Sequence, residues 1–201
     1  MSRIIALFLS LFIFCTVNSF ANIEKSNSPI KFDSAPLNLE EIINFSGKIF
    51  SGICTNIEEI EKDPQSNLHV TKYTFKVTEG IKGITDESEV TFKQWAEVSR
   101  EVAYKKGGKY IAFLYPESKL GLTSTVGFLQ GQFTVTKGLD NNEYIKNNLN
   151  NTGLAQNLKT KKNILITRDR SLNDYIHKQS KEGNSINYKE FIKATRYLIE
   201  K

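Results

Sequence analysis

Few side chains in this sequence are arranged to carry out catalysis. A hydrolytic triad needs a nucleophile, a base and an orienting group. The only two histidines are His69 and His177, and neither sits in a recognisable motif. The sequence contains no G-x-S-x-G, no H-E-x-x-H and no phosphate-binding P-loop motif. We therefore interpret both histidines as surface or strand-edge residues and predict no catalytic residue, with an enzyme of unrecognised class as an alternative.

Metal ligands are equally sparse. A zinc site needs several cysteine or histidine ligands close together, whereas Cys54, His69 and His177 are scattered along the chain. Acidic and amide residues at 58–63 and 140–143 could contribute to calcium binding, but neither stretch has the ligand spacing of a known calcium loop. The sequence therefore predicts no metal and no other cofactor, and solvated acidic loops are the preferred interpretation.

Two glutamines lie beside aromatic residues in strand-like stretches. Gln94 precedes Trp95, the only tryptophan, and Gln130 lies between two glycines and close to Phe133. In a structural interpretation, the amides bond to nearby backbone and the glycines allow a bulge. In a functional interpretation, aromatic faces and adaptable amides form a recognition surface. These four residues are the candidate binding patch.

The first residues of the chain indicate export. Arg3 precedes an apolar run of about eleven residues at 4–14, and small residues follow it. This run fits the 7–15-residue core of a signal peptide and is shorter than the roughly 20 residues of a membrane-spanning helix. We predict a signal peptide over residues 1–21, cleavage near Ala21 and Asn22, and a periplasmic or secreted protein with no transmembrane helix in the mature chain.

Cleavage of the signal peptide would remove Cys15 and leave Cys54 alone, so no intramolecular disulfide could form. A lipid anchor on Cys15 is an alternative, although Phe14 is bulky where lipoprotein signals carry a small residue. We expect Cys54 to be a buried thiol, with an intermolecular disulfide or a reactive thiol as alternatives. The formal net charge would fall from +5 to +4, a small excess that argues against nucleic acid as the partner.

The rest of the sequence predicts a mainly β protein with helices. Residues 22–36 are polar and without pattern, which is typical of a flexible lead. Segments rich in β-branched and aromatic residues then alternate with turn-forming residues, which indicates strands at 48–57, 68–78, 89–94, 109–115 and 128–136. Five short strands in a row favour an antiparallel barrel or sandwich, and we predict a small five-stranded OB-like barrel over residues 37–136.

Helical and polar segments flank this predicted barrel. Asn38 and Glu41 have the spacing of a capping box in front of a short helix that ends at Gly47. After the barrel, residues 137–163 are rich in Asn, Lys and Gly, which predicts a long polar loop.

Residues 164–201 predict a helical C-terminal extension. Residues 164–167 could add an edge strand, and Ser171 could cap a helix. Asn187 and Glu190 have the spacing of a second capping box. Apolar residues then recur at helical spacing, so we expect a pair of helices that packs on the barrel, with a partner-binding helix as the alternative.

Several sequence blocks follow one another over about 90 residues: Ser51-Gly52-Ile53, Y-T-F-K-V at 73–77 with Lys82-Gly83, V-T-F-K-Q at 90–94, G-K-Y-I-A-F-L at 108–114 and V-G-F-L-Q-G-Q-F at 126–133. In this order, the blocks resemble a group of uncharacterised exported bacterial proteins. This resemblance implies export but no activity.

The order Y-x-F-x-V, K-G and G-x-Y-x-x-F is also similar to netrin-like domains of tissue inhibitors of metalloproteinases. That resemblance implies a five-stranded OB-type barrel. It does not extend to the inhibitory mechanism, which uses an N-terminal cysteine fixed by disulfides, while the mature chain would keep only Cys54. A fold alone does not assign a function.

The sequence therefore predicts an exported, non-enzymatic binding module that recognises a protein or a cell-envelope component. One alternative is an inhibitor or accessory partner of an exported protease. A second is an enzyme, which would need a cleft that joins a histidine or Cys54 to carboxylates. A third is an OB-type nucleic-acid binder, in which basic and aromatic residues would share one groove.

Overall fold

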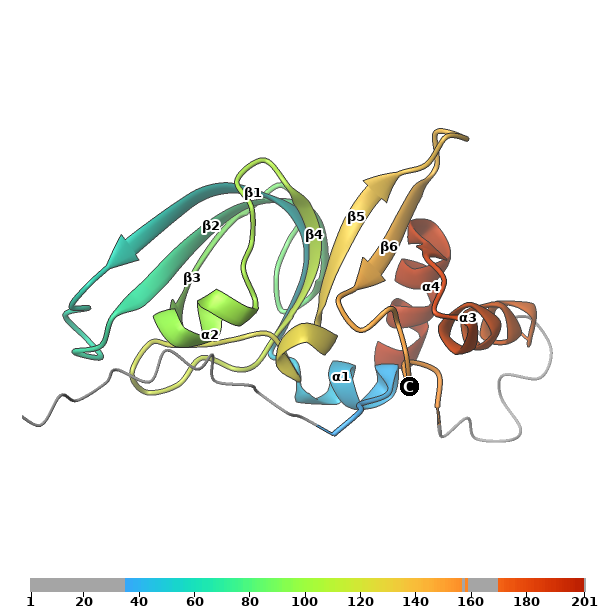
Figure 1. Cartoon of the computed structure of the whole chain (residues 1–201), viewed down its shortest axis with the longest axis horizontal. Helices are drawn as coiled ribbons and strands as arrows, with labels where there is room; N and C mark the ends of the chain where they lie inside the picture. Colours follow the sequence, from blue (N-terminus) through green and yellow to red (C-terminus); the bar gives the residue numbers. More distant parts are fainter. Residues whose placement is uncertain (1–34, 157, 159–169, 201) are drawn as a thin grey trace, which may run out of the picture. The chain divides into compact units, whose positions relative to one another are not determined.

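Seven strands form one antiparallel sheet in the computed structural model, which describes residues 35–156, 158 and 170–200. The strand order is β3-β2-β1-β4-β5-β6-β7 (Figure 1). The elements are α1 (Leu39–Phe45), β1 (Lys48–Ile60), β2 (Val70–Lys82), β3 (Glu89–Trp95), α2 (Ala96–Glu101), β4 (Lys109–Leu114), η1 (Phe128–Gln130), β5 (Gln132–Lys137), β6 (Glu143–Asn147), α3 (Arg170–Glu182), β7 (Ile186–Asn187) and α4 (Tyr188–Ile199).

The sheet is open, because β3 and β7 are its edges and do not pair with each other. The prediction of a mainly β protein with helices is confirmed, and the closed five-stranded OB-like barrel is not. Two further strands, β6 and β7, are not among the predicted ones and extend the sheet beyond β5. The last predicted strand begins later than expected, because Gly127 and Phe128 have left-handed φ angles of 59° and 54° that an extended strand does not accept.

Both faces of the sheet are buried at its centre, in β1 and β4. Alternate side chains of a strand point to opposite faces, and two separate clusters result. We call the first the helical core, since α1, α3 and α4 cover it; it includes Ile49, Ile111, Phe113, Phe133, Ile145 and Phe191. The second is the aromatic core, made of Phe50, Cys54, Tyr73, Phe75, Val77, Val90, Phe92, Tyr104, Tyr110, Ala112 and Leu114.

The two cores lie against different helices. In Figure 1, β1, β2 and β3 curve over α2, whereas α1, α3 and α4 gather beside β5 and β6. The expected capping box of α1 is present: Glu41 N donates to Asn38 Oδ1 at 3.0 Å, and Asn38 N donates to Glu41 Oε2 at 2.9 Å. At α4, Asn187 accepts from the backbone of Glu190 at 3.3 Å, but its own N–H donates to Tyr175 Oη at 3.0 Å.

Residues 137–156, expected to belong to a polar loop, contain β6 and a series of turns instead. Asn147 and Asn151 are 5% and 0% exposed. Asn147 Oδ1 accepts from the backbone of Asn151 at 2.7 Å and of Leu149 at 3.1 Å. Asparagine bonds readily to nearby backbone and accepts a left-handed φ, as Asn150 and Asn151 do here. The polar composition that predicted a loop therefore stabilises an ordered segment.

Other predictions concern residues outside the described part of the chain: the signal peptide at 1–21, most of the lead at 22–36 and the edge strand at 164–167. Helix α3 begins at Arg170, so Ser171 lies within it rather than at its cap. None of the described helices has the length and apolar character needed to cross a membrane.

Candidate functional site

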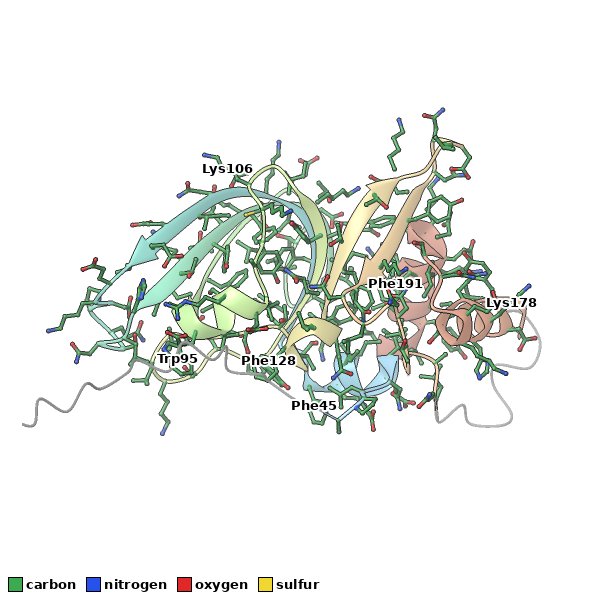
Figure 2. The ribbon with its side chains drawn as sticks, in the orientation of Figure 1. Phe45, Trp95, Lys106, Phe128, Lys178 and Phe191 are labelled. Atoms are coloured by element: carbon green, nitrogen blue, oxygen red, sulfur yellow. The ribbon has the colours of Figure 1, made fainter. Side chains whose placement is uncertain are left out.

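The four residues of the candidate binding patch do not lie together on the surface. Gln94, Gln130 and Phe133 are 0%, 2% and 0% exposed. Trp95 is 39% exposed and occupies the junction of β3 and α2 (Figure 2). Three of the four side chains are therefore buried, and the structure gives each of them different surroundings.

Gln130 and Phe133 have structural partners. Gln130 Oε1 accepts from the backbone N–H of Leu37 at 2.6 Å, and its Nε2 donates to the carbonyl of Ala35 at 3.0 Å. These bonds hold the segment before α1 against η1. The ring of Phe133 packs in the helical core, 4.8 Å from the ring of Phe191. Phe191 lies on α4 and is labelled in Figure 2.

Gln94 differs from Gln130 in having no partner for its amide. Neither its Nε2 nor its Oε1 forms a hydrogen bond with any described residue. Gln94 is paired across the β2–β3 ladder with Thr71, and directly opposed residues point to the same face of a sheet. Because Thr71 lines a cleft on that face, Gln94 lies on the same face of the sheet as this cleft, next to one of its lining residues.

The cleft lies between the ends of β1 and β2 on one side and α2 with the following loop on the other, and its volume is about 610 Å³. The register of β1 and β2 explains its composition, because Ile57 pairs with Tyr73 and Glu59 with Thr71. The alternation of strands then brings every second residue to the cleft. The lining residues are Ile57, Glu59, Glu61, His69, Thr71, Tyr73, Ala96, Ser99, Arg100, Ala103 and Tyr104.

The base of the cleft is polar and almost completely buried. Ser99 and Tyr104 are 7% and 3% exposed, and neither hydroxyl has a hydrogen-bond partner in the described part of the chain. The Tyr104 ring packs edge-on against the rings of Tyr73 at 4.9 Å and Phe75 at 5.0 Å. Tight packing in the aromatic core therefore fixes where the Tyr104 hydroxyl lies.

Burial controls the charge state of the two phenols at the base. Desolvation raises the pKa of Tyr104 well above its usual value, and the nearby Tyr73 adds to the shift. Desolvation also raises the pKa of Tyr73, while the Ser99 hydroxyl lies close enough to oppose that shift without a hydrogen bond of normal geometry. Both phenols are consequently neutral and can donate or accept a hydrogen bond.

Charged residues form the exposed rim. Glu59 is held at both oxygens: Oε2 lies 3.0 Å from His69 Nε2, and Oε1 accepts from the Thr71 hydroxyl at 3.0 Å. The guanidinium of Arg100 is paired with Glu97. Glu61 has no hydrogen bond or ion pair with a described residue. The rim therefore offers one unengaged carboxylate and a second carboxylate that reaches the base through Thr71.

This arrangement is suited to hydrogen bonding rather than to an evident reaction. The cleft does join a histidine to carboxylates, but within the described residues His69 bonds to no hydroxyl or thiol. Cys54 is buried, and desolvation raises its pKa, which keeps the thiol protonated and unreactive. Among the described residues no group of three or more metal-ligating side chains is found.

His177 lies elsewhere, on α3, where it lines a separate hollow with Ser180 and Lys181 and no described carboxylate. Sequence reasoning missed Ser99 and Tyr104, because α2 was not predicted and a hydroxyl's missing partner is visible only in three dimensions. The two-residue spacing of Glu59 and Glu61 at the end of β1, and of His69 and Thr71 at the start of β2, was readable from the sequence. It would have pointed to the rim if the register had been known.

No known protein family matches this chain, and no curated protein matches it, so the cleft is interpreted from its own residues.

Proposed function

We propose that this protein is an exported, non-enzymatic binding module, and that part of a protein or cell-envelope component enters the cleft between β1, β2 and α2. The observation that carries the proposal is a group of buried polar side chains without partners: the Gln94 amide and the hydroxyls of Ser99 and Tyr104. Buried polar groups in proteins are almost always hydrogen-bonded. A ligand that donates to or accepts from these groups would satisfy them.

The energetic argument favours a ligand over a purely structural role. Leaving a buried donor or acceptor unsatisfied costs about 1–3 kcal/mol, whereas an apolar group of the same shape costs nothing of this kind. Phenylalanine and alanine would preserve the packing at positions 104 and 99. Proteins depart from such local rules mainly at functional sites. Ser99 and Tyr104 both line one cleft with a charged, accessible rim, and Gln94 is paired with the lining residue Thr71 on the neighbouring strand.

Affinity capture from cell envelope and culture medium tests the proposal. We compare the parent protein with a Ser99→Ala, Tyr104→Phe variant and with a Tyr144→Phe control, which removes a phenol bonded to Asp140 in an exposed turn. Far-ultraviolet circular dichroism first establishes that all three are folded. A partner retained by the parent and the control but lost by the cleft variant supports the proposal; equal capture by all three contradicts it.

An enzyme is the second candidate, because His69 Nε2 lies 3.0 Å from Glu59 in the same cleft as Ser99. A carboxylate can orient a histidine that acts as a general base. Turnover of an ester, phosphate or glycoside substrate that disappears in His69→Ala but persists in His177→Ala would favour this candidate. The closed OB-like barrel remains a prediction, and so does the alternative function as an inhibitor or accessory partner of an exported protease. The binding proposal depends on neither.

A further inference from the structure

We infer that the cleft recognises a primary alkylammonium group, of the kind carried by a lysine side chain of a protein or peptide. The inference rests on the proposed function, since it names the chemistry of the ligand that would occupy the same cleft. Three properties of the lining residues support it: the charge at the rim, the acceptors at the base and the apolar contacts between them.

The rim favours a cation, because its acidic groups exceed its available basic groups. The lining residues include two carboxylates, Glu59 and Glu61, and one guanidinium, Arg100. Arg100 is paired with Glu97, and His69 Nε2 is directed at Glu59, so each of these two donors already faces a carboxylate. Glu61 faces the cleft with no partner among the described residues. The whole chain has a formal net charge of +5, so the excess of carboxylates at this cleft is opposite in sign to the net charge of the protein.

The base supplies neutral acceptors that match an ammonium. An ammonium has three donors and no acceptor, and a serine or tyrosine hydroxyl oxygen can accept from it. Ser99 Oγ and Tyr104 Oη are such oxygens, each more than nine-tenths buried and without a partner. Glu59 supplies a charged acceptor at the exposed rim, and its Oε1 bonds to the buried Thr71 hydroxyl.

The apolar lining residues favour a methylene stem over a sugar ring. Ile57, Ala96 and Ala103 bring aliphatic surface to the cleft, and the four-carbon stem of lysine buries its methylenes along such surface. The rings of Tyr73 and Tyr104 are too buried, at 2% and 3% exposed, to offer the open stacking face that a sugar would use.

A titration of the purified protein separates these features. The probes are Nα-acetyl-lysine amide, its norleucine analogue with the same stem but no ammonium, glucosamine, and N-acetylglucosamine. We expect the lysine derivative to bind at least tenfold more tightly than the norleucine analogue, measured by calorimetry. Hydrogen bonds to charged groups contribute about 1.5–3 kcal/mol, which corresponds to about tenfold or more in affinity.

A matched pair of variants locates the binding. Glu61→Gln removes the unengaged rim carboxylate and should weaken binding of the lysine derivative about tenfold. Glu58→Gln is the control, because Glu58 alternates with Glu59 on β1 and pairs with Lys72 at 2.9 Å, away from the cleft. Equal loss in both variants, or loss in neither, would overturn the inference.

The remaining outcomes distinguish this inference from the proposed function. Equal affinity for the lysine and norleucine probes, or no binding of the lysine probe, overturns the ammonium inference. N-acetylglucosamine binding that is lost in Tyr104→Phe would leave the cleft as a binding site but assign it a neutral ligand. Glucosamine binding that exceeds that of the lysine probe and falls in Glu61→Gln would keep the ammonium and overturn the lysine stem. The capture experiment decides the proposed function independently of every probe.

Discussion

The two sides of the sheet treat buried polar groups in opposite ways. On the side of the helical core, buried polar side chains have partners: Ser180 Oγ donates to the carbonyl of Asn151 at 2.6 Å, and Thr195 Oγ1 donates to that of Phe191 at 2.9 Å. On the side of the aromatic core lie Gln94, Ser99 and Tyr104. In the described part of the chain, all buried side-chain nitrogen and oxygen atoms without a hydrogen-bond partner belong to these three residues.

This difference separates polar residues that hold the fold from polar residues that the fold does not need. Asn147 and Gln130 connect turns and termini to the helical core by side-chain hydrogen bonds to backbone. The partnerless groups form no side-chain hydrogen bond with any described residue. Ser99 and Tyr104 line the cleft on the aromatic side, and Gln94 is paired with the lining residue Thr71. The two sides should therefore respond to substitution with opposite signs.

The largest effect is expected at Asn147. Its Oδ1 accepts from the backbone of Leu149 and Asn151, and its Nδ2 donates to the carbonyl of Gln130 at 3.2 Å. Asn147→Ala would leave these buried groups without partners, so we expect the free energy of unfolding to fall by about 3 kcal/mol. Urea denaturation measures this loss, and Asn142→Ala, in an exposed turn, is the control with a change of about 0.5 kcal/mol or less. A loss below 1 kcal/mol at Asn147 would contradict the assigned role.

The two glutamines offer the most direct comparison of the two sides. Gln130→Met removes the bonds to Leu37 N and the Ala35 carbonyl, and we expect a loss of about 2 kcal/mol in the free energy of unfolding. Gln94→Met removes two partnerless atoms in a chain of similar volume, and we expect a gain of about 1 kcal/mol. Urea denaturation of the two variants side by side measures both changes. Destabilisation of similar size in both would show that Gln94 is hydrogen-bonded in solution.

A gain of the same size as that of Gln94→Met is expected at Tyr104. Tyr104→Phe keeps the ring contacts with Tyr73 and Phe75 and removes only the partnerless hydroxyl, so stability should rise by about 1 kcal/mol. Tyr110→Phe is the matched control, because the Tyr110 hydroxyl accepts from the backbone of Lys105 at 2.9 Å and its loss should destabilise the protein. Thermal unfolding reports the sign of each change. Destabilisation by Tyr104→Phe would remove the energetic argument for a ligand.

The contrast between the two sides also shows what the sequence could predict. The alternation in residues 70–77 and the cap at Asn38 were sufficient to predict a strand and a helix, because both signals are local. The buried strand β6 was missed, since Ile145 is a lone apolar anchor whose burial depends on α4 and β7. The open sheet could not be derived either, because five strands from local patterns do not specify how the edges are completed.

Of the four residues in the candidate binding patch, only Gln94 is paired with a residue that lines the cleft. Gln94 was selected because an amide beside aromatics is unusual, and it does lie next to the cleft. Gln130 carried the same local signal and proved to have backbone partners. Local sequence cannot distinguish the two, because partners 93 and 95 residues away in the chain decide which amide is satisfied.

The smallest expected effect on stability is that of the ion pair between Lys93 and Asp63. Lys93 is the neighbour of Gln94 on β3, and its side chain lies on the opposite face of the strand. The pair therefore tests the comparison of the two sides within a single strand. Lys93 Nζ pairs with Asp63 Oδ1 at 2.8 Å, and Ser66 also donates to this carboxylate. The Lys93 ammonium and the Ser66 bonds lower the pKa of Asp63 from 3.8 to about 2. A lowered carboxyl pKa stabilises the folded protein fully above the unfolded value, and this contribution is lost as the pH falls through the folded value.

We therefore expect the stabilisation from Asp63 to be constant above about pH 4 and to decline towards pH 2. Urea midpoints measured from pH 6 to pH 2 test this: the difference between the parent and Asp63→Asn should shrink over the lowest two pH units and stay constant above them. Gln94→Met should leave that pH dependence unchanged, since the amide does not titrate and its side chain faces the other side of β3. A difference that persists undiminished at pH 2 would show that Asp63 acts through hydrogen bonds that survive its protonation. The ion pair with Lys93 would then have no measurable part in fixing this face of the strand.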